Sequence, residues 1–117
     1  MISISVPVKL VSEANMREHW AIKNKRKKHQ QAVIFYALAG LKKDIPAFPV
    51  HVVITRVGVR KLDSDNLAGS AKGVRDQIAK ILGCDDGDEA KVTWEYRQRR
   101  GVPKEYSMDL IIQARNA

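Results

Sequence analysis

The chain has little of several features that define whole classes of protein. It carries a single cysteine, Cys84, in 117 residues, so it has neither an internal disulfide nor a zinc site built from cysteines alone. No apolar run approaches the roughly 18 residues that span a bilayer. The first residues alternate in polarity instead of forming a signal peptide. We see no internal repeat, low-complexity segment or linker, so we expect one domain over residues 1–117, located by default in the cytoplasm.

What the chain does have is a folded protein's composition together with a strong positive charge. Hydrophobic residues make up 44%, the formal net charge is +8 and the pI is about 9.8. A chain of this length forms one small core, which a partner subunit would help to stabilise. A strongly basic protein is more often a ligand of a polyanion, and nucleic acid is the commonest one.

Hydrophobic periodicity predicts six elements in the order β-α-β-α-β-β. Residues 2–10 alternate as a half-buried strand, and Pro7 places this strand at an edge or ends its pairing. A helix is expected from an N-cap at Ser12 or Asn15 to about Leu41. The pattern then predicts a strand at 50–59, a helix at 65–82, and strands at 91–98 and 105–114 joined by a hairpin loop at 99–104. The predicted fold class is α/β (α+β), a small mixed sheet with two helices packed on it.

The acids of this basic chain are concentrated in one segment. Residues 63–89 hold seven acids against three basic residues, a formal charge of −4, so the rest of the chain carries +12. Clustered carboxylates repel unless a cation lies among them, and that cation is either a divalent metal or a basic side chain. Solvated turns are the alternative interpretation.

The "DSDN" stretch at residues 63–66 is the densest part of that segment. Asp63 and Asp65 are two residues apart, so in an extended segment both point the same way and can face one hard cation such as Mg²⁺. A calcium loop does not fit, because its sixth position needs glycine and this chain has Ala68 there.

The second predicted helix places polar residues opposite an apolar stripe. Asp65, Lys72 and Asp76 fall on one side. Lys72 and Asp76 are four residues apart and can pair on the helix surface. Two interpretations remain open, a surface ion pair of little energetic value or a lysine held over the acids to contact a phosphate. The stripe comprises Leu67, Ala71, Val74, Ile78, Ile81 and Leu82.

Three basic runs suit a phosphate backbone, although a charge run is also typical of a solvated face. We find no zinc finger, aromatic RNA-binding signature or helix-turn-helix. Trp20, Trp94 and Tyr96 could stack on bases, but packing in the core is the commoner role of such residues. The candidate DNA-binding residues in the runs are Lys23, Lys25, Arg26, Lys27, Lys28, Arg60, Lys61, Arg97, Arg99 and Arg100.

The stretch "KLDSDNLAGSAKGVRDQIAKILGCDDGD", residues 61–88, resembles the signature of the RusA family of Holliday-junction resolvases, which is common in phages and prophages. "NMREHW" and "WEYRQ" are similar to segments of phage-type members. The resemblance implies a RusA-like fold, a homodimer, and Mg²⁺ as cofactor with Mn²⁺ as a substitute. Some members carry their lysine four residues after the second aspartate, where this chain has Gly69, and Lys72 follows at seven.

The resemblance also implies a set of functional residues. Asp63, Asp65 and Asp86 would bind the metal, and with Lys72 would form the catalytic set. The neighbouring residues expected to support them are Asn66, Asp76, Asp85 and Asp88. The implied function is a Mg²⁺-dependent, structure-selective endodeoxyribonuclease that resolves four-way junctions by paired nicks in DNA recombination and repair. The alternatives are a junction-binding protein without cleavage, a metal-dependent nuclease for other branched or linear nucleic acids, and a structural dimer with no nucleic-acid role.

Overall fold

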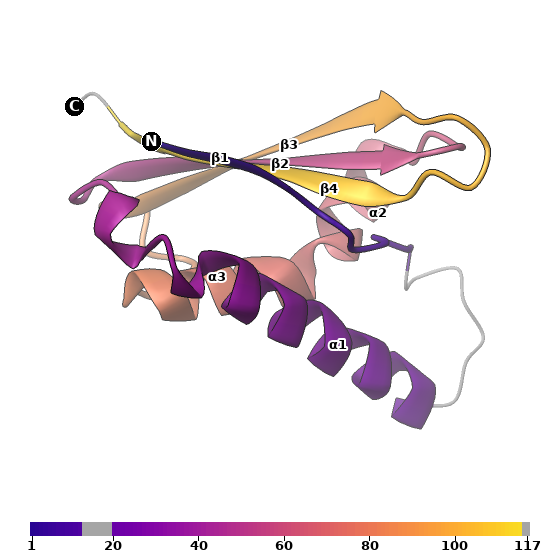
Figure 1. Cartoon of the computed structure of the whole chain (residues 1–117), viewed down its shortest axis with the longest axis horizontal. Coiled ribbons are helices and arrows are strands. Elements are labelled where there is room, and N and C mark those ends of the chain that lie inside the picture. The colour runs from indigo at the N-terminus through magenta and orange to yellow at the C-terminus, as the bar shows by residue number, and fades with distance from the viewer. Residues whose placement is uncertain (13–19, 116–117) are drawn as a thin grey trace.

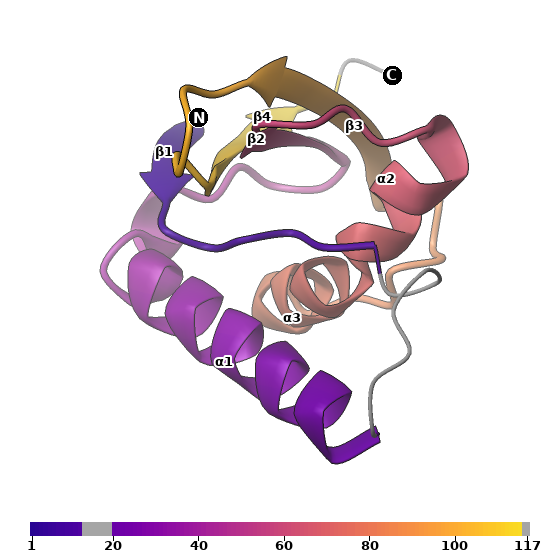
Figure 2. The same ribbon diagram turned by 90° about the vertical axis from the view of Figure 1, so that its right-hand side faces the viewer.

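The computed structural model describes residues 1–12 and 20–115 as two layers, a sheet and a set of helices on one of its faces (Figures 1 and 2). The termini of the described chain lie near the same end of the sheet (Figure 1). The strands are β1 (Ile2–Val6), β2 (Val50–Gly58), β3 (Val92–Arg100) and β4 (Ser107–Ala114). The helices are α1 (Trp20–Ala39), the short 3-10 helix η2 (Lys42–Asp44), α2 (Ser64–Ser70) and α3 (Lys72–Leu82).

The sheet is mixed, with the order β1-β4-β2-β3. β4 runs antiparallel to both β1 and β2, whereas β3 runs parallel to β2. The predicted order of strands and helices is confirmed, and β1 is an edge strand that ends before Pro7 as expected. The α2–α3 segment is therefore the crossover between two parallel strands.

The predicted hairpin between the last two strands is wrong. β3 and β4 do not pair, because β2 lies between them. The parallel crossover brings β3 back beside β2, and the only open edge of β2 is then on its other side. The chain consequently passes over the end of β2, where the Gly101 N–H donates to the Gly58 carbonyl at 2.9 Å. Turn residues in the loop predict a reversal of direction, but not which strand the chain reaches.

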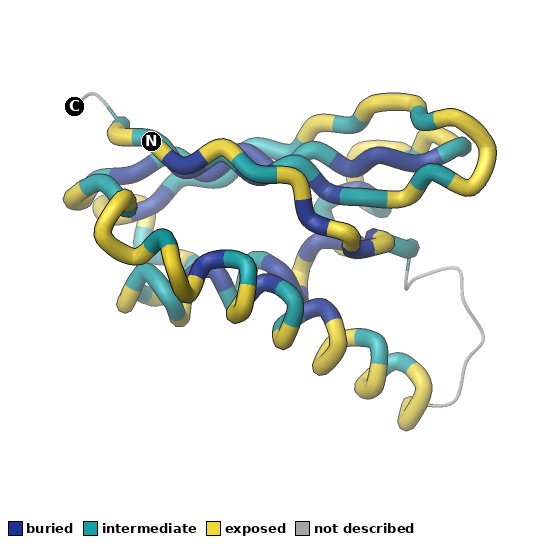
Figure 3. The backbone as a smooth tube through the Cα atoms, in the orientation of Figure 1, coloured by how far each residue is buried: buried dark blue, intermediate teal, exposed yellow. Residues whose placement is uncertain are grey.

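The core lies between the sheet and the helices (Figure 3). Alternate side chains of the two central strands face it, and α1 and α3 close it from below in Figure 1. Its fully buried members include Val50, Val52, Ile54, Leu110, Ile112, Ile34, Leu38, Val74 and Ile78. On β2 the alternation continues past Ile54 to Arg56, which is polar but only 7% exposed.

The helix predicted over 65–82 is two helices that meet at Ala71. Ala71 has φ −97° and ψ 1°, so it ends α2 and begins α3. The flanking Gly69 and Gly73 weaken helix formation. The Ser70 hydroxyl donates to the Leu67 carbonyl at 2.7 Å, a local bond that competes with the helical pattern. The predicted apolar stripe is nevertheless confirmed, because its first four members are buried and the last two are partly buried.

The ends of the other helices agree with the sequence signals where the structure describes them. α3 stops at Gly83, whose φ of 81° is the left-handed conformation that favours glycine. α1 ends before Gly40, and the predicted cap Asn15 lies outside the described residues. In the described part of the chain, no helix has the length and apolarity needed to cross a bilayer.

Candidate functional site

The two carboxylates of "DSDN" lie at the beginning of α2. Asp63 is the N-cap, and its Oδ1 accepts a hydrogen bond from the Asn66 backbone N–H at 2.9 Å. This bond satisfies one of the free donors at the helix start, so Asp63 has a local structural role. Asp65 is in the first turn of α2 and its residue is exposed. Among the described residues, Asp65 has no such capping bond.

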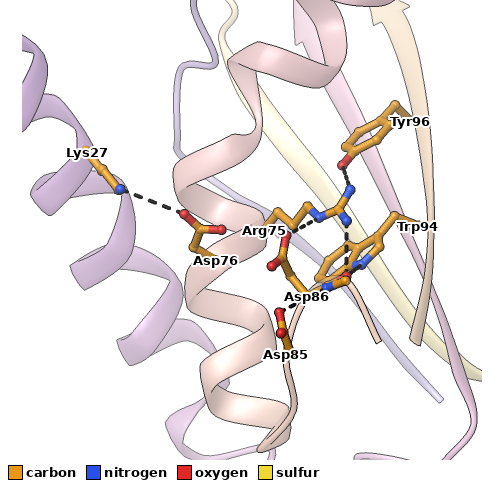
Figure 4. Close-up of polar contacts among 8 residues, drawn as sticks. Lys27, Arg75, Asp76, Asp85, Asp86, Trp94 and Tyr96 are labelled. Carbon is orange, nitrogen blue, oxygen red and sulfur yellow. Dashed lines mark hydrogen bonds and ion pairs between the residues drawn. The ribbon is translucent and has the colours of Figure 1, made fainter. Parts of the chain in front are cut away.

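Asp86 lies in a separate cluster that we call the acid corner, formed by Arg75, Asp86, Trp94 and Tyr96 (Figure 4). Arg75 Nε donates to Asp86 Oδ2 at 2.8 Å, and Nη2 donates to the Asp86 carbonyl at 3.0 Å. Its Nη1 donates to the Tyr96 hydroxyl at 2.8 Å. Trp94 Nε1 also donates to the Asp86 carbonyl, at 2.9 Å. The corner thus joins α3, the following turn and β3.

The surroundings of Arg75 in the acid corner favour its charged form. Burial alone lowers the pKa of the Arg75 guanidinium, but the hydrogen bonds and charge interactions with Tyr96 and Asp86 outweigh it and raise that pKa above its ordinary value. The Arg75 guanidinium also lies 4.9 Å from the centre of the Trp94 ring. The interpretation of Trp94 and Tyr96 as packed residues is borne out, since both are half-buried against the core.

The three predicted metal ligands do not form one ligand group. Across residues 1–12 and 20–115, no three His, Cys, Asp or Glu side chains are close enough together to hold a metal. Asp86 is paired with Arg75, and Asp63 caps α2. The set therefore fits a divalent cation only in part, through the carboxylates at the start of α2, because Asp86 does not complete a three-residue group with them. Mg²⁺ is often held by one or two carboxylates together with substrate phosphates.

Two other predicted acids stabilise the turn after α3. Asp85 Oδ1 accepts from the Gly87 N–H at 3.2 Å, and Asp88 Oδ1 accepts from the Ala90 N–H at 3.2 Å. Short side-chain bonds of this kind are a standard function of aspartate in turns. The structure therefore gives both residues a local role.

Lys72 and Asp86, two of the predicted catalytic residues, line the same small hollow. Lys72 is exposed at the first position of α3. The hollow has a volume of about 240 Å³ and is also lined by Ala68, Gly69, Arg75 and Tyr96. Asp65 precedes Gly69 by one helical turn, so α2 brings its first turn toward the same region. An ammonium and a paired carboxylate thus meet beside the helix that carries Asp65.

The predicted pairing of Lys72 with Asp76 is not what the structure shows. Asp76 pairs with Lys27 of α1, whose Nζ lies 3.8 Å from Asp76 Oδ2 (Figure 4). Because α1 packs against α3, a cation from the neighbouring helix is available to Asp76. The four-residue spacing permits a pair within one helix, but it contains no information about neighbours. No described carboxylate forms an ion pair with Lys72.

A larger groove runs between α1 and the α2–α3 junction. Its volume is about 610 Å³, and Lys23, Lys27 and Lys72 line it together with Trp20. Trp20 is 71% exposed, so the expectation that it packs in the core is wrong. Trp20 is the first described residue of α1, well before the buried residues of that helix, Gln30, Ile34 and Leu38.

The basic run of α1 is divided by the helical repeat. Lys23 and Lys27 are four residues apart and line the groove, whereas Lys25 and Lys28 are exposed elsewhere on the helix. Arg26 is half-buried and has contacts of its own. Only part of this run is therefore available to a ligand in the groove.

A second basic concavity, which we call the basic hollow, lies where β2 and β3 end. It has a volume of about 370 Å³ and contains no carboxylate in its lining. The residues around it are Arg56, Gly58, Val59, Arg60, Lys61, Gln98, Arg99 and Arg100. It includes four of the ten predicted DNA-binding residues.

Arg97 and Arg99, two of the predicted DNA-binding residues, have carboxylate partners. Arg97 pairs with Glu95 on the same strand. The hydrogen bonds that Glu95 receives from His51 and from Arg97 lower the pKa of Glu95. Arg99 borders the basic hollow but lies 3.4 Å from Asp109 and 3.9 Å from Glu105. Much of the charge of these two arginines is thus compensated within the protein.

Sequence reasoning missed the residues that connect these features. Gln98 receives the Leu62 N–H on its Oε1 at 3.0 Å and donates from its Nε2 to the Leu62 carbonyl at 2.7 Å. These two hydrogen bonds tie the segment before Asp63 to β3. Arg75, in "GVRD", follows Ala71 by four residues and so lies on the same side of the helix as the apolar stripe. Its side chain nevertheless extends to Asp86 in the turn after α3. No spacing rule indicates either contact, because both cross between elements.

A scan against protein-family models and a search of curated protein sequences both found no match for this chain. The likeness to the RusA family therefore rests on the residues quoted from the sequence.

Proposed function

We propose that the protein is a Mg²⁺-dependent, structure-selective endodeoxyribonuclease that nicks four-way DNA junctions in pairs. The observation that carries the proposal is the meeting of Lys72 with the Asp86 corner in one hollow beside the helix that bears Asp65. Two cation-lined concavities flank this region. Carboxylates that can hold a cation, next to a lysine without a described carboxylate partner, suit the hydrolysis of a phosphodiester.

Each residue has a definite part in the proposal. Lys72 has no carboxylate partner among the described residues, so its ammonium is available to a phosphate oxygen on which charge develops. Arg75 holds Asp86 through its side chain and its backbone carbonyl, and is thus a positioning residue. Asn66 continues the cap of α2 through its N–H.

Magnesium is the proposed cofactor, with Asp63 and Asp65 as the residues to hold it. When bound, such an ion polarises a phosphoryl oxygen and lowers the pKa of a coordinated water. Asp86 is not grouped with these two acids in the described chain, so it would join them as a third ligand only if the two regions moved together. Two opposing nicks require two sites, so the proposal includes a symmetric dimer.

The test compares a synthetic four-way junction with a linear duplex of the same sequence, each with and without Mg²⁺. We expect symmetric nicks in two opposing strands of the junction with Mg²⁺ only, and none with the Asp65→Asn variant. Asp44→Asn, an exposed carboxylate on η2, is the matched control and should cut normally. Junction binding without any Mg²⁺-dependent product would favour the non-catalytic alternative. Equal cutting of the linear duplex would favour a general nuclease.

A further inference from the structure

The basic hollow is built around Arg56, which forms no ion pair with any residue that the structure describes. Arg56 is 7% exposed, and its only hydrogen bonds within the described chain go to carbonyl groups. Nε donates to the Leu10 carbonyl at 2.9 Å, and Nη1 donates to the Arg60 carbonyl at 2.7 Å. Burial lowers the pKa of Arg56, but an arginine remains protonated at neutral pH. A buried charge without a counterion is costly.

One end of the Arg56 guanidinium is directed to the hollow. Nη2 donates to no described residue. Among the residues of known placement, no fully buried side-chain nitrogen or oxygen lacks a partner, so Nη2 is accessible. Gly58 makes room for the group, because a Cβ there would lie 2.8 Å from Arg56 Nη1 and 3.0 Å from Nη2. Arg56 thus presents free N–H groups to the same space that Arg60, Lys61 and Arg100 border.

The charges around the hollow are not balanced locally. Of its five cations, Arg99 has carboxylate partners, and the other four have no ion pair within the described part of the chain. Convergent arginines with free N–H groups match the oxygens of a phosphate, which they bind through paired hydrogen bonds.

From these observations we propose that the basic hollow binds a backbone phosphate of a nucleic-acid strand, neighbouring the one at Asp65. Lys61 borders the hollow and precedes Asp63 by two residues. The residue between them, Leu62, is held against β3 by two hydrogen bonds to the Gln98 side chain. A phosphate held at Arg56 would therefore set the position of the strand relative to α2. This inference rests on the proposed function for its choice of nucleic acid.

The experiment uses ¹⁵N-labelled full-length protein without divalent metal, titrated with an eight-residue oligothymidylate. We expect shifts of the Arg56 Nε–H resonance and of the amides of Gly58, Arg60 and Lys61. The double variant Arg60→Gln/Arg100→Gln should bind at least about 10-fold more weakly, because it removes two phosphate contacts. Lys42→Gln/Lys43→Gln removes the same charge from η2, outside the hollow, and should change affinity less than about 2-fold.

A variant that keeps every charge can separate the effect of the position of Arg56 from general electrostatic attraction to the oligonucleotide. Gly58→Ala pushes the Arg56 guanidinium out of position and should weaken oligonucleotide binding at unchanged net charge. Its fold is checked by the core amides, and Arg60→Gln/Arg100→Gln decides the matter if Gly58→Ala unfolds. Equal weakening by both double variants would overturn the proposal. So would shifts at these residues with inorganic phosphate but not with the oligonucleotide.

The two proposals fail in different ways. If the hollow binds the oligonucleotide but the protein nicks no junction, the nuclease proposal fails and the phosphate-site proposal stands. If Arg60→Gln/Arg100→Gln cleaves and binds the junction like the native protein, the phosphate-site proposal fails and the nuclease proposal stands.

Discussion

The acid corner and the basic hollow lie at opposite ends of the same crossover and treat charge in opposite ways. In the corner, Arg75 is matched by Asp86 and Tyr96. In the hollow, Arg56, Arg60, Lys61 and Arg100 have no described carboxylate partner. Removing one partner from a matched pair leaves an uncompensated charge at a large cost, and a buried unmatched charge opposes folding unless a ligand supplies the counterion. Within the described chain, part of the positive charge behind the net +8 is thus gathered in one hollow without a local carboxylate.

The largest expected effect is on the cleavage rate, through Lys72, which unlike the neighbouring Arg75 and Asp86 has no described charge partner. Lys72→Met should reduce the rate of junction cleavage about 100-fold or more, because the ammonium would stabilise charge in the transition state. Junction affinity without metal should change little, as one phosphate contact is lost among several. Lys80→Met, an exposed lysine on the same helix, is the control. Single-turnover cleavage and a gel-shift measurement check both statements, and equal rates for the two variants would contradict them.

The acid corner should show its effect on stability. Arg75→Gln removes the bonds to Asp86 and Tyr96, and we expect the free energy of unfolding to fall by about 2 kcal/mol after allowing for partial exposure. Urea denaturation measures this change. Lys80→Gln should change it by less than about 0.5 kcal/mol. An Arg75→Gln variant as stable as Lys80→Gln would show that the corner is not a structural unit.

The basic hollow should show its effect on binding and not on stability. Arg60→Gln should reduce the dependence of log affinity for DNA on log salt concentration by about 1, because one phosphate contact is lost. The free energy of unfolding should stay within about 0.5 kcal/mol, since the Arg60 side chain is exposed. A salt titration by fluorescence anisotropy checks the slope. A large loss of stability with an unchanged slope would reverse the contrast between the two regions.

The smallest expected effect is on the alkylation rate of Cys84, whose thiol lies near the carboxylates of the turn after α3. Burial raises the pKa of the Cys84 thiol, and Asp88 adds to the rise. At pH 8 the native thiol therefore holds its proton more than a peptide thiol does, and alkylation by iodoacetamide should be several-fold slower. The same shift stabilises the fold below the ordinary thiol pKa and is lost as the pH rises through the native pKa. Asp88→Asn should speed alkylation, and a native rate equal to the peptide's would contradict the sign.

Much of the architecture could be predicted because it depends on local patterns. Alternation in "ISISV" and the β-branched, mostly alternating run "VHVVITRVG" indicated the strands, and the stripe from Leu67 to Ile78 indicated the buried helix face. The pairing of β3 with β2 could not be predicted, since a parallel neighbour is chosen by the whole crossover and not by a turn. The loop at 99–104 has turn residues, and these do not say which edge is free.

The sequence singled out candidate site residues but not their contacts. Asp65 and Lys72 stood out by type and spacing, whereas Asp86 and the catalytic role of Lys72 were implied by the resemblance to the RusA family. Their partners depend on packing between elements, which no linear spacing encodes. Asp86 pairs with Arg75 instead of joining the acids of α2, and the acid expected to pair with Lys72 pairs with α1. The break at Ala71 also removed the single helical frame on which the spacing argument depended.

The claim on which the account depends is that the carboxylates at the start of α2 hold a divalent cation. Titration of ¹⁵N-labelled protein with Mn²⁺ tests it directly, because the paramagnetic ion broadens nearby amide resonances. The account predicts broadening of residues 63–66 at the lowest Mn²⁺ concentrations, and its loss in Asp65→Asn. Broadening that begins at the exposed acids of the turn after α3, with residues 63–66 remaining sharp, would contradict it.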